Sequence, residues 1–402
     1  MSRIFFTILS LVLSSACLAQ RPDPLCVLDP DRMPESWRPS AEVQNSLNPA
    51  PWSESEAKDA EYAIKTGLDE MIDYFKRKPS AVPFLWDDSI EALIGVTYSS
   101  ASKPEFDAKV RDAARNNLTV LITPYLNLDP TSARCDEFER LLPLAIFAHR
   151  LYPPKDARTD AVTERTNAAY RVCGSLEDAT DYDIQEILAD KRAPADELYE
   201  LYIWCLWFIE AELFPDIELP VEAREFSRAL WKYFETYRLA GASEFEKGAR
   251  DDEFIEIADL ATHIVHIPSG MHRFPLFVED LPGLYRFHRE NIYPVLQTGY
   301  LDLLASFVDS LRQYGCTAEN DVQVRDGTRY LLKVFHEGKD RWMAYRREGE
   351  TDTNLDDYHL IHKAWTGVLG LRVRQFEQPN PGTYGGIVRS WLPHPRWHGT
   401  SR

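Results

Sequence analysis

The sequence predicts an all-α fold in which helical hairpins form an α/α toroid or a solenoid-like arrangement with few short strands. Three observations indicate this class: apolar residues recur at helical spacing in one segment after another, prolines separate these segments, and glycine supplies only 18 of the 402 residues. So many segments exceed what a four-helix bundle accommodates. Residues 118–125 and 342–346 are the stretches whose composition resembles strands.

Residues 1–19 have the pattern of a secretory signal peptide. Arg3 precedes an apolar run, and small residues end the segment at Ala19. The run is shorter than the roughly 20 residues that span a bilayer, and no later segment reaches that length without charges. We therefore expect a secreted or periplasmic protein with no transmembrane segment in its mature form. Lipoprotein processing at Cys17 is the alternative, although Ser14 stands where leucine is expected.

The chain is strongly acidic. It has 45 Lys and Arg against 64 Asp and Glu, which gives a net charge of −19. Nucleic acids and anionic membranes are bound by clustered basic side chains. We therefore expect no nucleic-acid partner.

Residues 20–52 form a proline-rich leader that we expect either to wrap the surface or to remain mobile. Seven prolines lie between residues 21 and 51, and no periodic apolar pattern accompanies them. Ser53 and Glu56 then match a capping box, so the first helix starts near residue 54. It opens a helical domain over residues 53–378, and residues 379–402 are predicted to form an irregular tail.

Five cysteines remain once the signal peptide is removed, so at least one is unpaired. Cys135 and Cys173 lie at the open end of a predicted helix hairpin, which makes them the first choice for a disulfide. Cys205 lies in an apolar segment and is predicted to be a buried thiol. A bond between Cys26 and Cys316 is open, because spacing gives no evidence for it.

The segment over residues 195–214 is apolar almost all round, so we expect a central helix. A stripe that begins at Phe226 stops at Gly241, where a left-handed C-cap is predicted. Helical patterns continue over residues 253–266, 284–314, 326–336 and 356–376.

A cluster of histidines marks the candidate site. In the helix over residues 253–266, the polar residues Glu256, Asp259, His263 and His266 share one face. A loop over residues 268–275 follows, with the pair His272 and Arg273 between two prolines. Loops that carry polar groups on a rigid scaffold are common places for function.

The first interpretation of this cluster is a divalent metal site. Asp259, His263 and His266 would supply two imidazoles and one carboxylate, and His359 and His362 would add ligands from a second helix. A solvated stripe with carboxylate–histidine pairs across helical turns explains the same residues.

The second interpretation is a site for an extracellular carbohydrate, in a polysaccharide lyase or glycosidase-like enzyme. His272, Arg273, Tyr285 and His288 would provide the acid, base and cation that such chemistry needs. Ten Trp and 19 Tyr offer surfaces for stacking against sugar rings, although core packing is the stronger explanation, above all for Trp204 and Trp207. The acidic net charge disfavours a polyanionic glycan.

A third interpretation is a secreted interaction protein without catalysis. No nucleophile elbow, HExxH motif, Walker loop or dinucleotide fingerprint occurs in the sequence. Acidic residues are too abundant for a glycosidase carboxylate pair to be located from the sequence.

Overall fold

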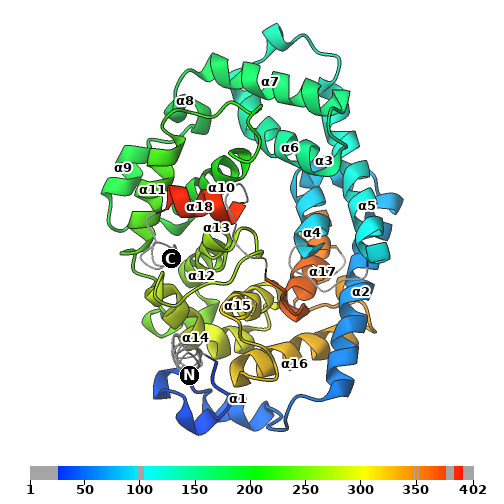
Figure 1. Ribbon diagram of the computed structural model, residues 1–402. Coiled ribbons are helices and arrows are strands. Elements are labelled where there is room, and N and C mark those ends of the chain that lie inside the picture. The colour runs from blue at the N-terminus through cyan, green and yellow to red at the C-terminus, as the bar shows by residue number, and fades with distance from the viewer. Residues whose placement is uncertain (1–25, 98–103, 348, 352, 377–383, 393–402) are drawn as a thin grey trace, which may run out of the picture.

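The computed structural model describes residues 26–97, 104–347, 349–351, 353–376 and 384–392. Within these ranges every regular element is a helix and no residue belongs to a strand, so the all-α prediction is confirmed (Figure 1). None of the helices in these ranges is long and apolar enough to cross a bilayer. The predicted signal peptide, residues 1–19, lies outside the described residues.

Helices follow one another with short connections from residue 30 onward. The α-helices are α1 (Ala41–Ser46), α2 (Glu54–Arg77), α3 (Ala81–Leu85), α4 (Asp88–Thr97), α5 (Pro104–Ile122), α6 (Phe138–Leu151), α7 (Ala157–Cys173), α8 (Leu176–Thr180), α9 (Ile184–Ala189), α10 (Ala195–Ala211), α11 (Ala223–Phe234), α12 (Asp252–Ile264), α13 (His266–Ser269), α14 (Pro282–Thr298), α15 (Leu301–Gln313), α16 (Val322–Glu337), α17 (Asp357–Leu371) and α18 (Tyr384–Trp391). The 3-10 helices are η1 (Pro30–Arg32), η2 (Glu35–Trp37), η3 (Thr123–Tyr125), η4 (Pro130–Ser132), η5 (Cys135–Glu137), η6 (Ala242–Glu244), η7 (Gly248–Arg250) and η8 (Trp342–Ala344).

The residues of the leader from Cys26 onward lie against α14 and α16. A disulfide joins Cys26 to Cys316, and the backbone N–H of Val27 donates to Asp321 over 2.8 Å. Further along, Gln323 donates to the carbonyl of Trp37 over 2.9 Å. These bonds fix the leader to the helical body.

The start of α2 and the α6–α7 hairpin agree with the sequence. Ser53 and Glu56 form the predicted capping box at the start of α2. The predicted disulfide between Cys135 and Cys173 is confirmed, and it closes the open end of the α6–α7 hairpin. Cys205 is a free and fully buried thiol, as predicted.

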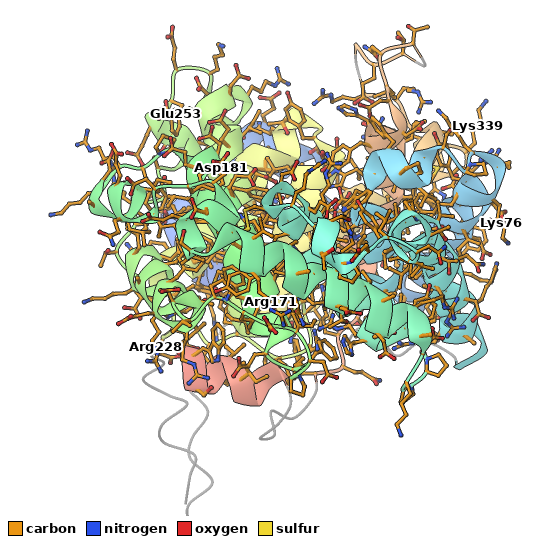
Figure 2. All side chains as sticks on the ribbon, turned by 90° about the horizontal axis from the view of Figure 1, so that it is seen from above. Lys76, Arg171, Asp181, Arg228, Glu253 and Lys339 are labelled. Carbon is orange, nitrogen blue, oxygen red and sulfur yellow. A yellow bond between two sulfur atoms is a disulfide. The ribbon has the colours of Figure 1, made fainter. Side chains whose placement is uncertain are left out.

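Helix α10 is enclosed on all its faces. It contacts α6, α11, α12, α13 and α18, and its middle carries the buried rings of Trp204, Trp207 and Phe208. Charged side chains such as Lys76, Arg171 and Glu253 instead project from the outer surface (Figure 2). The predicted central position of this helix is confirmed.

Both strand predictions are wrong, because tertiary packing overrides local composition. Residues 118–125 complete α5 and form η3, with Leu118, Leu121 and Ile122 buried at helical spacing. Residues 342–346 contain η8, which carries the buried ring of Trp342. A Cβ on Gly367 would lie 2.6 Å from that ring, so the ring packs directly on the backbone of α17.

Three helix ends also differ from the sequence interpretation. Helix α11 stops at Phe234, well before Gly241, whose φ of −81° is not left-handed. The segment over residues 284–314 is split into α14 and α15 at Gly299, where φ is 74°. Part of the predicted irregular tail forms the helix α18. Arg228 of α11 donates hydrogen bonds to the carbonyls of Trp391 and Ser390 in this helix (Figure 2).

Pairwise packing connects the inner helices in a closed order. Helix α4 packs on α17, α17 on α15, α15 on α12, α12 on α10 and α10 on α6, and α5 connects α6 to α4 (Figure 1). The candidate site is built from polar side chains of these helices.

Candidate functional site

The predicted catalytic pair His272 and Arg273 lies in a tight turn after α13. Gly270, Met271 and His272 have φ angles of 58°, 52° and 73°, in the region that non-glycine residues rarely adopt. The backbone N–H of Met271 donates to the carbonyl of His266 over 2.9 Å, and the backbone N–H of Phe274 donates to the carbonyl of Ser269 over 2.8 Å. Residues 271–274 are all buried, so the turn directs the pair into the protein interior.

His272 lies in a buried charge network. It is 2% exposed, and its Nδ1 lies 3.1 Å from Oδ2 of Asp309, which also pairs with Arg374. Burial and the charge of Arg374 lower the pKa of His272 to about 3, so the ring is neutral at pH 7. Burial opposes ionisation of Asp309, but Arg374 and His272 together hold its pKa below the usual range.

Arg273 connects the turn to α10. Its Nη2 donates to Glu210 over 2.6 Å, and its Nε donates to the carbonyl of Gly270 over 2.8 Å. Arg150 of α6 pairs with the other oxygen of Glu210. Paired buried charges of this kind hold elements in register and are costly to break.

Tyr285 and His288 lie on α14 in surroundings of their own. The hydroxyl of Tyr285 accepts a hydrogen bond from Arg289 over 3.0 Å. The Nδ1 of His288 donates to the carbonyl of Leu284 over 2.9 Å, and burial lowers the pKa of His288 to about 3. All four predicted catalytic side chains are buried, and the structure does not gather them at an accessible surface.

The predicted metal ligands of the first helix are divided between α12 and α13. The Nδ1 of His263 donates to the carbonyl of Asp259 over 2.8 Å. The Nδ1 of His266 lies 2.9 Å from the hydroxyl of Tyr202. Each ring therefore has one nitrogen engaged within the protein.

The second pair, on α17, has separate carboxylate partners. His359 lies 2.7 Å from Asp356 at the exposed start of the helix, and His362 lies 3.5 Å from Asp302 of α15. In the described ranges, the group of three ligand atoms close enough for an ion is Cys26, Cys316 and Asp321, and its two sulfurs are bonded to each other. The structure thus brings no three of the predicted metal ligands within ion-binding distance.

Three of the predicted metal ligands, Asp259, His263 and His362, face one place together with polar side chains of other inner helices. We call this place the recess. It is defined by carboxyl, imidazole and phenol groups from the helices α4, α10, α12, α15 and α17 and from Asp87, the residue before α4. Its members are Asp87, Asp88, Glu91, Tyr199, Asp259, His263, Asp302, Tyr358 and His362.

The recess is enclosed by protein and still open to solvent. The charges of Asp302, Asp259 and Asp88 all raise the pKa of His362, so the three carboxyl groups surround that ring. The side chains of Asp259, Asp302 and His362 are 51%, 45% and 23% exposed. Burial nevertheless is the largest influence on the pKa of Asp88, Asp302 and His362. A surface that desolvates its charges and yet admits solvent is suited to a ligand.

Asp302 and His362 form an ionised pair. Burial opposes the carboxylate, but the hydrogen bond and charge of His362 lower the pKa of Asp302 to about 2. Burial likewise opposes the imidazolium, and Asp302 more than offsets it, so the pKa of His362 is raised. Asp302 is therefore negatively charged across the physiological range.

The carboxyl groups at the start of α4 have the opposite shift. Burial and mutual repulsion raise the pKa of Asp87 and of Glu91. Burial also raises the pKa of Asp88, although His362 and His263 oppose this. The surroundings thus favour the ionised form of Asp302 and the protonated forms of Asp87, Asp88 and Glu91, and such a separation is how enzymes distinguish a base from an acid.

Backbone strain and an aromatic surface accompany these carboxyl groups. Trp86, directly before Asp87, has φ 53° and ψ −128°, a conformation that is costly for an aromatic residue and is often found at functional sites. On the α17 side, Tyr358 stacks on His362 with ring centroids 4.9 Å apart.

The carboxyl groups of α4 and Asp302 were left unassigned by the sequence analysis. The signal available was Asp88 and Glu91 at i and i+3, followed by an almost uncharged helix. That signal is weak in a chain with 64 acidic residues, because it does not reveal which carboxyl groups meet.

No protein-family model matches the chain, and no curated protein or solved structure is significantly similar to it.

Proposed function

We propose that this protein is an exported glycoside hydrolase whose inner helices form an α/α toroid around the recess. The observation that carries the proposal is the separation of carboxyl pKa values, with Asp88 raised and Asp302 lowered to about 2 in one enclosed surface. Two disulfides support export, because such bonds persist in oxidising compartments.

In this mechanism Asp88 is the general acid and Asp302 is the base or nucleophile. The protonated carboxyl of Asp88 gives its proton to the glycosidic oxygen as the bond to the anomeric carbon breaks. The carboxylate of Asp302 either takes a proton from the attacking water or attacks the anomeric carbon itself. Burial raises the pKa of Asp88 and so favours its protonated form, whereas the hydrogen bond and charge of His362 favour the ionised form of Asp302.

The recess favours a neutral glycan over a uronate. Asp259 and Asp302 would repel a sugar carboxylate, and Arg273, which a lyase would need for that carboxylate, is engaged with Glu210. The stacked rings of Tyr358 and His362 provide a flat surface for a pyranose face. The hydrolase is therefore preferred to the lyase.

Removal of either carboxyl tests the proposal. We expect Asp88→Asn and Asp302→Asn each to lower turnover of a neutral glycan by about 10² to 10⁴-fold, as for a positioned acid or base. Asp112→Asn is the matched control, because Asp112 is an exposed acid of α5 paired with Arg115. Reducing-end release from a panel of polysaccharides is the measurement, with and without chelator. Unchanged turnover in both recess variants would reject the assignment.

A further inference from the structure

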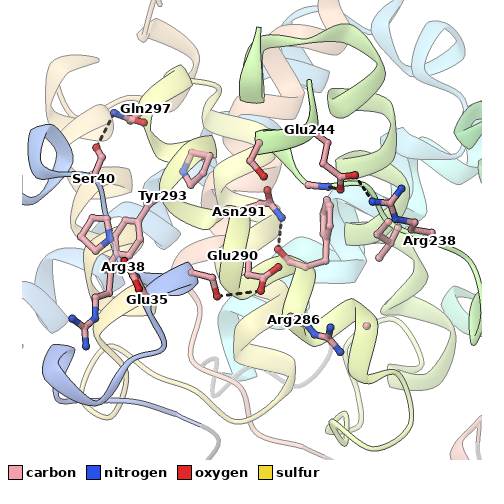
Figure 3. A pocket seen from close by; sticks show the side chains of 18 of the residues that line it. Glu35, Arg38, Ser40, Arg238, Glu244, Arg286, Glu290, Asn291, Tyr293 and Gln297 are labelled. Carbon is pink, nitrogen blue, oxygen red and sulfur yellow. Dashed lines mark hydrogen bonds and ion pairs between the residues drawn. The ribbon is translucent and has the colours of Figure 1, made fainter. Parts of the chain in front are cut away.

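A second polar surface lies over α14, away from the side chains that form the recess. Arg286, Glu290, Tyr293 and Gln297 follow at i, i+4, i+7 and i+11 and so form one row along the helix (Figure 3). The row is the floor of a groove with a volume of about 1090 Å³, comparable with the largest small-ligand sites, which reach roughly 1,000 Å³. We call it the α14 groove.

The leader forms one wall of the α14 groove. The hydroxyl of Ser36 donates to Glu290 over 3.2 Å, and Gln297 donates to Ser40 over 3.5 Å (Figure 3). The ring of Trp37 packs edge-on against Tyr285 with centroids 5.8 Å apart. Together with the Cys26–Cys316 disulfide, these contacts hold the wall in place before any ligand arrives.

Residues 237–244 form the opposite wall. The buried N–H of Ala242 donates to Oδ1 of Asn291 over 2.8 Å, and Nδ2 of Asn291 donates to the carbonyl of Phe287 over 2.8 Å. Glu244 accepts from the N–H of Gly241 over 2.9 Å. Both walls are therefore preorganised, which reduces the entropy lost on binding.

The charges of the groove are balanced. Three arginines and three glutamates line it, in a chain whose net charge is −19: Arg38, Arg238, Arg286, Glu35, Glu244 and Glu290. A balanced lining gives neither a polyanion nor a polycation an advantage. It does offer many donors and acceptors to an uncharged polar ligand.

Peptide recognition does not suit this lining. Strand addition needs a sheet edge, and the described chain has none. Docking of an amphipathic helix needs an apolar floor, whereas the row on α14 is mostly charged or amide-bearing. The row repeats each helical turn, about 5.4 Å, which is close to the length of one pyranose unit.

We propose that the α14 groove binds a neutral oligosaccharide chain, as a glycan-binding surface separate from the recess. Arg286, which has no ion pair among the described residues, and the Gln297 amide would bond to sugar hydroxyls, and Tyr237 would contact a ring face. The binding does not require hydrolysis. The view that the bound chain is also the substrate rests on the proposed function.

The test is calorimetric titration of the full chain with neutral oligosaccharides of several linkages. Arg286→Ala is expected to weaken binding at least about tenfold, the usual effect of losing hydrogen bonds to a charged group. Gly283→Tyr is expected to abolish it, because no atom lies within 4 Å of a Cβ built at Gly283, so a larger side chain can start there and project into the groove. Arg111→Ala, at an exposed arginine of α5, is the matched control and should bind like the wild type.

Asp302→Asn separates this proposal from the proposed function. Oligosaccharide binding that survives Asp302→Asn and is lost in Gly283→Tyr supports the groove, whether or not any glycan is hydrolysed. Two results would overturn it: no binding to any member of the panel, or equal affinity in the wild type, Arg286→Ala and Gly283→Tyr. Equal affinity would place the bound chain in the recess.

Discussion

The turn over residues 270–273 and the recess contain the same kinds of side chains in opposite circumstances. In the turn, His272 and Arg273 are buried and each contacts a carboxylate, Asp309 for the neutral ring of His272 and Glu210 for the charged Arg273. In the recess, His362 and its carboxylate neighbours are partly exposed, and the acids of α4 repel one another. Residue type is therefore similar in the two regions, and what differs is how exposed the side chains are and how far their charges are neutralised.

The two regions differ in whether their charged side chains are neutralised by partners of opposite charge. A buried ion pair that is fully matched stabilises one arrangement and leaves nothing for a ligand. Carboxyl groups that remain unneutralised cost folding energy, and such groups are common where a protein performs chemistry. The turn and the recess are thus expected to respond differently to the same substitution.

Asp309→Asn should give the largest effect on stability. It removes the charge that Arg374 and His272 share, and breaking a buried pair typically costs about 3–5 kcal/mol. Asp302→Asn, on the same helix and half exposed, should cost about 1 kcal/mol or less. Denaturant unfolding of both variants measures the difference. Equal losses would remove the distinction between the two regions.

His272→Ala should rank next, with a loss of about 2 kcal/mol. It leaves a cavity in the core and removes the hydrogen bond to Asp309. His362→Ala should change the free energy of unfolding by less than about 1 kcal/mol, since its pair with Asp302 is solvent-accessible. Thermal and denaturant unfolding compare the two histidines. A greater loss in His362→Ala would contradict the burial argument.

Patterns within a segment could be predicted from the sequence. The capping box at Ser53, the buried Cys205 and the Cys135–Cys173 pair depend on neighbours in one helix or one hairpin. The strand prediction at residues 118–125 failed because Leu118 continues the helix α5, which begins at Pro104 and packs against α4 and α6.

Only part of the recess could be predicted, because it joins helices distant in sequence: Asp259, His263 and His362 were candidate metal ligands, whereas the carboxyl groups of α4 and Asp302 were not assigned. Asp88, Asp302 and His362 acquire their properties only when α4, α15 and α17 meet. The His272–Arg273 pair was conspicuous in the sequence, but burial of the turn was invisible there. A short local motif therefore drew attention to a turn whose side chains are buried.

In the recess, removing the carboxyl group of Asp88 should have a smaller effect on stability than the substitutions in the turn, and this effect should be stabilising and depend on pH. Burial raises the pKa of Asp88 in the folded protein, so the folded state holds this proton more tightly than the unfolded state does. The resulting contribution to the free energy of unfolding is fully present below the unfolded-state pKa of about 4 and is lost as the pH rises through the folded-state pKa. Asp88→Asn should therefore be more stable than the wild type above the folded-state pKa of Asp88, and its stability should depend less on pH. Unfolding curves across the acid-to-neutral range measure this. A steeper profile in the variant would contradict the raised pKa.

His359→Ala should have the smallest effect, and it tests the metal interpretation that the histidine spacing suggested. His359 is exposed at the start of α17, where its Nδ1 lies 2.7 Å from Asp356, and surface substitutions usually change stability by less than about 0.5 kcal/mol. Because its ring belongs to no three-ligand group in the described chain, neither His359→Ala nor His263→Ala should change metal content. Elemental analysis of the purified protein and both variants provides the measurement. A stoichiometric ion that is present in the wild type and lost from either variant would restore the metal interpretation.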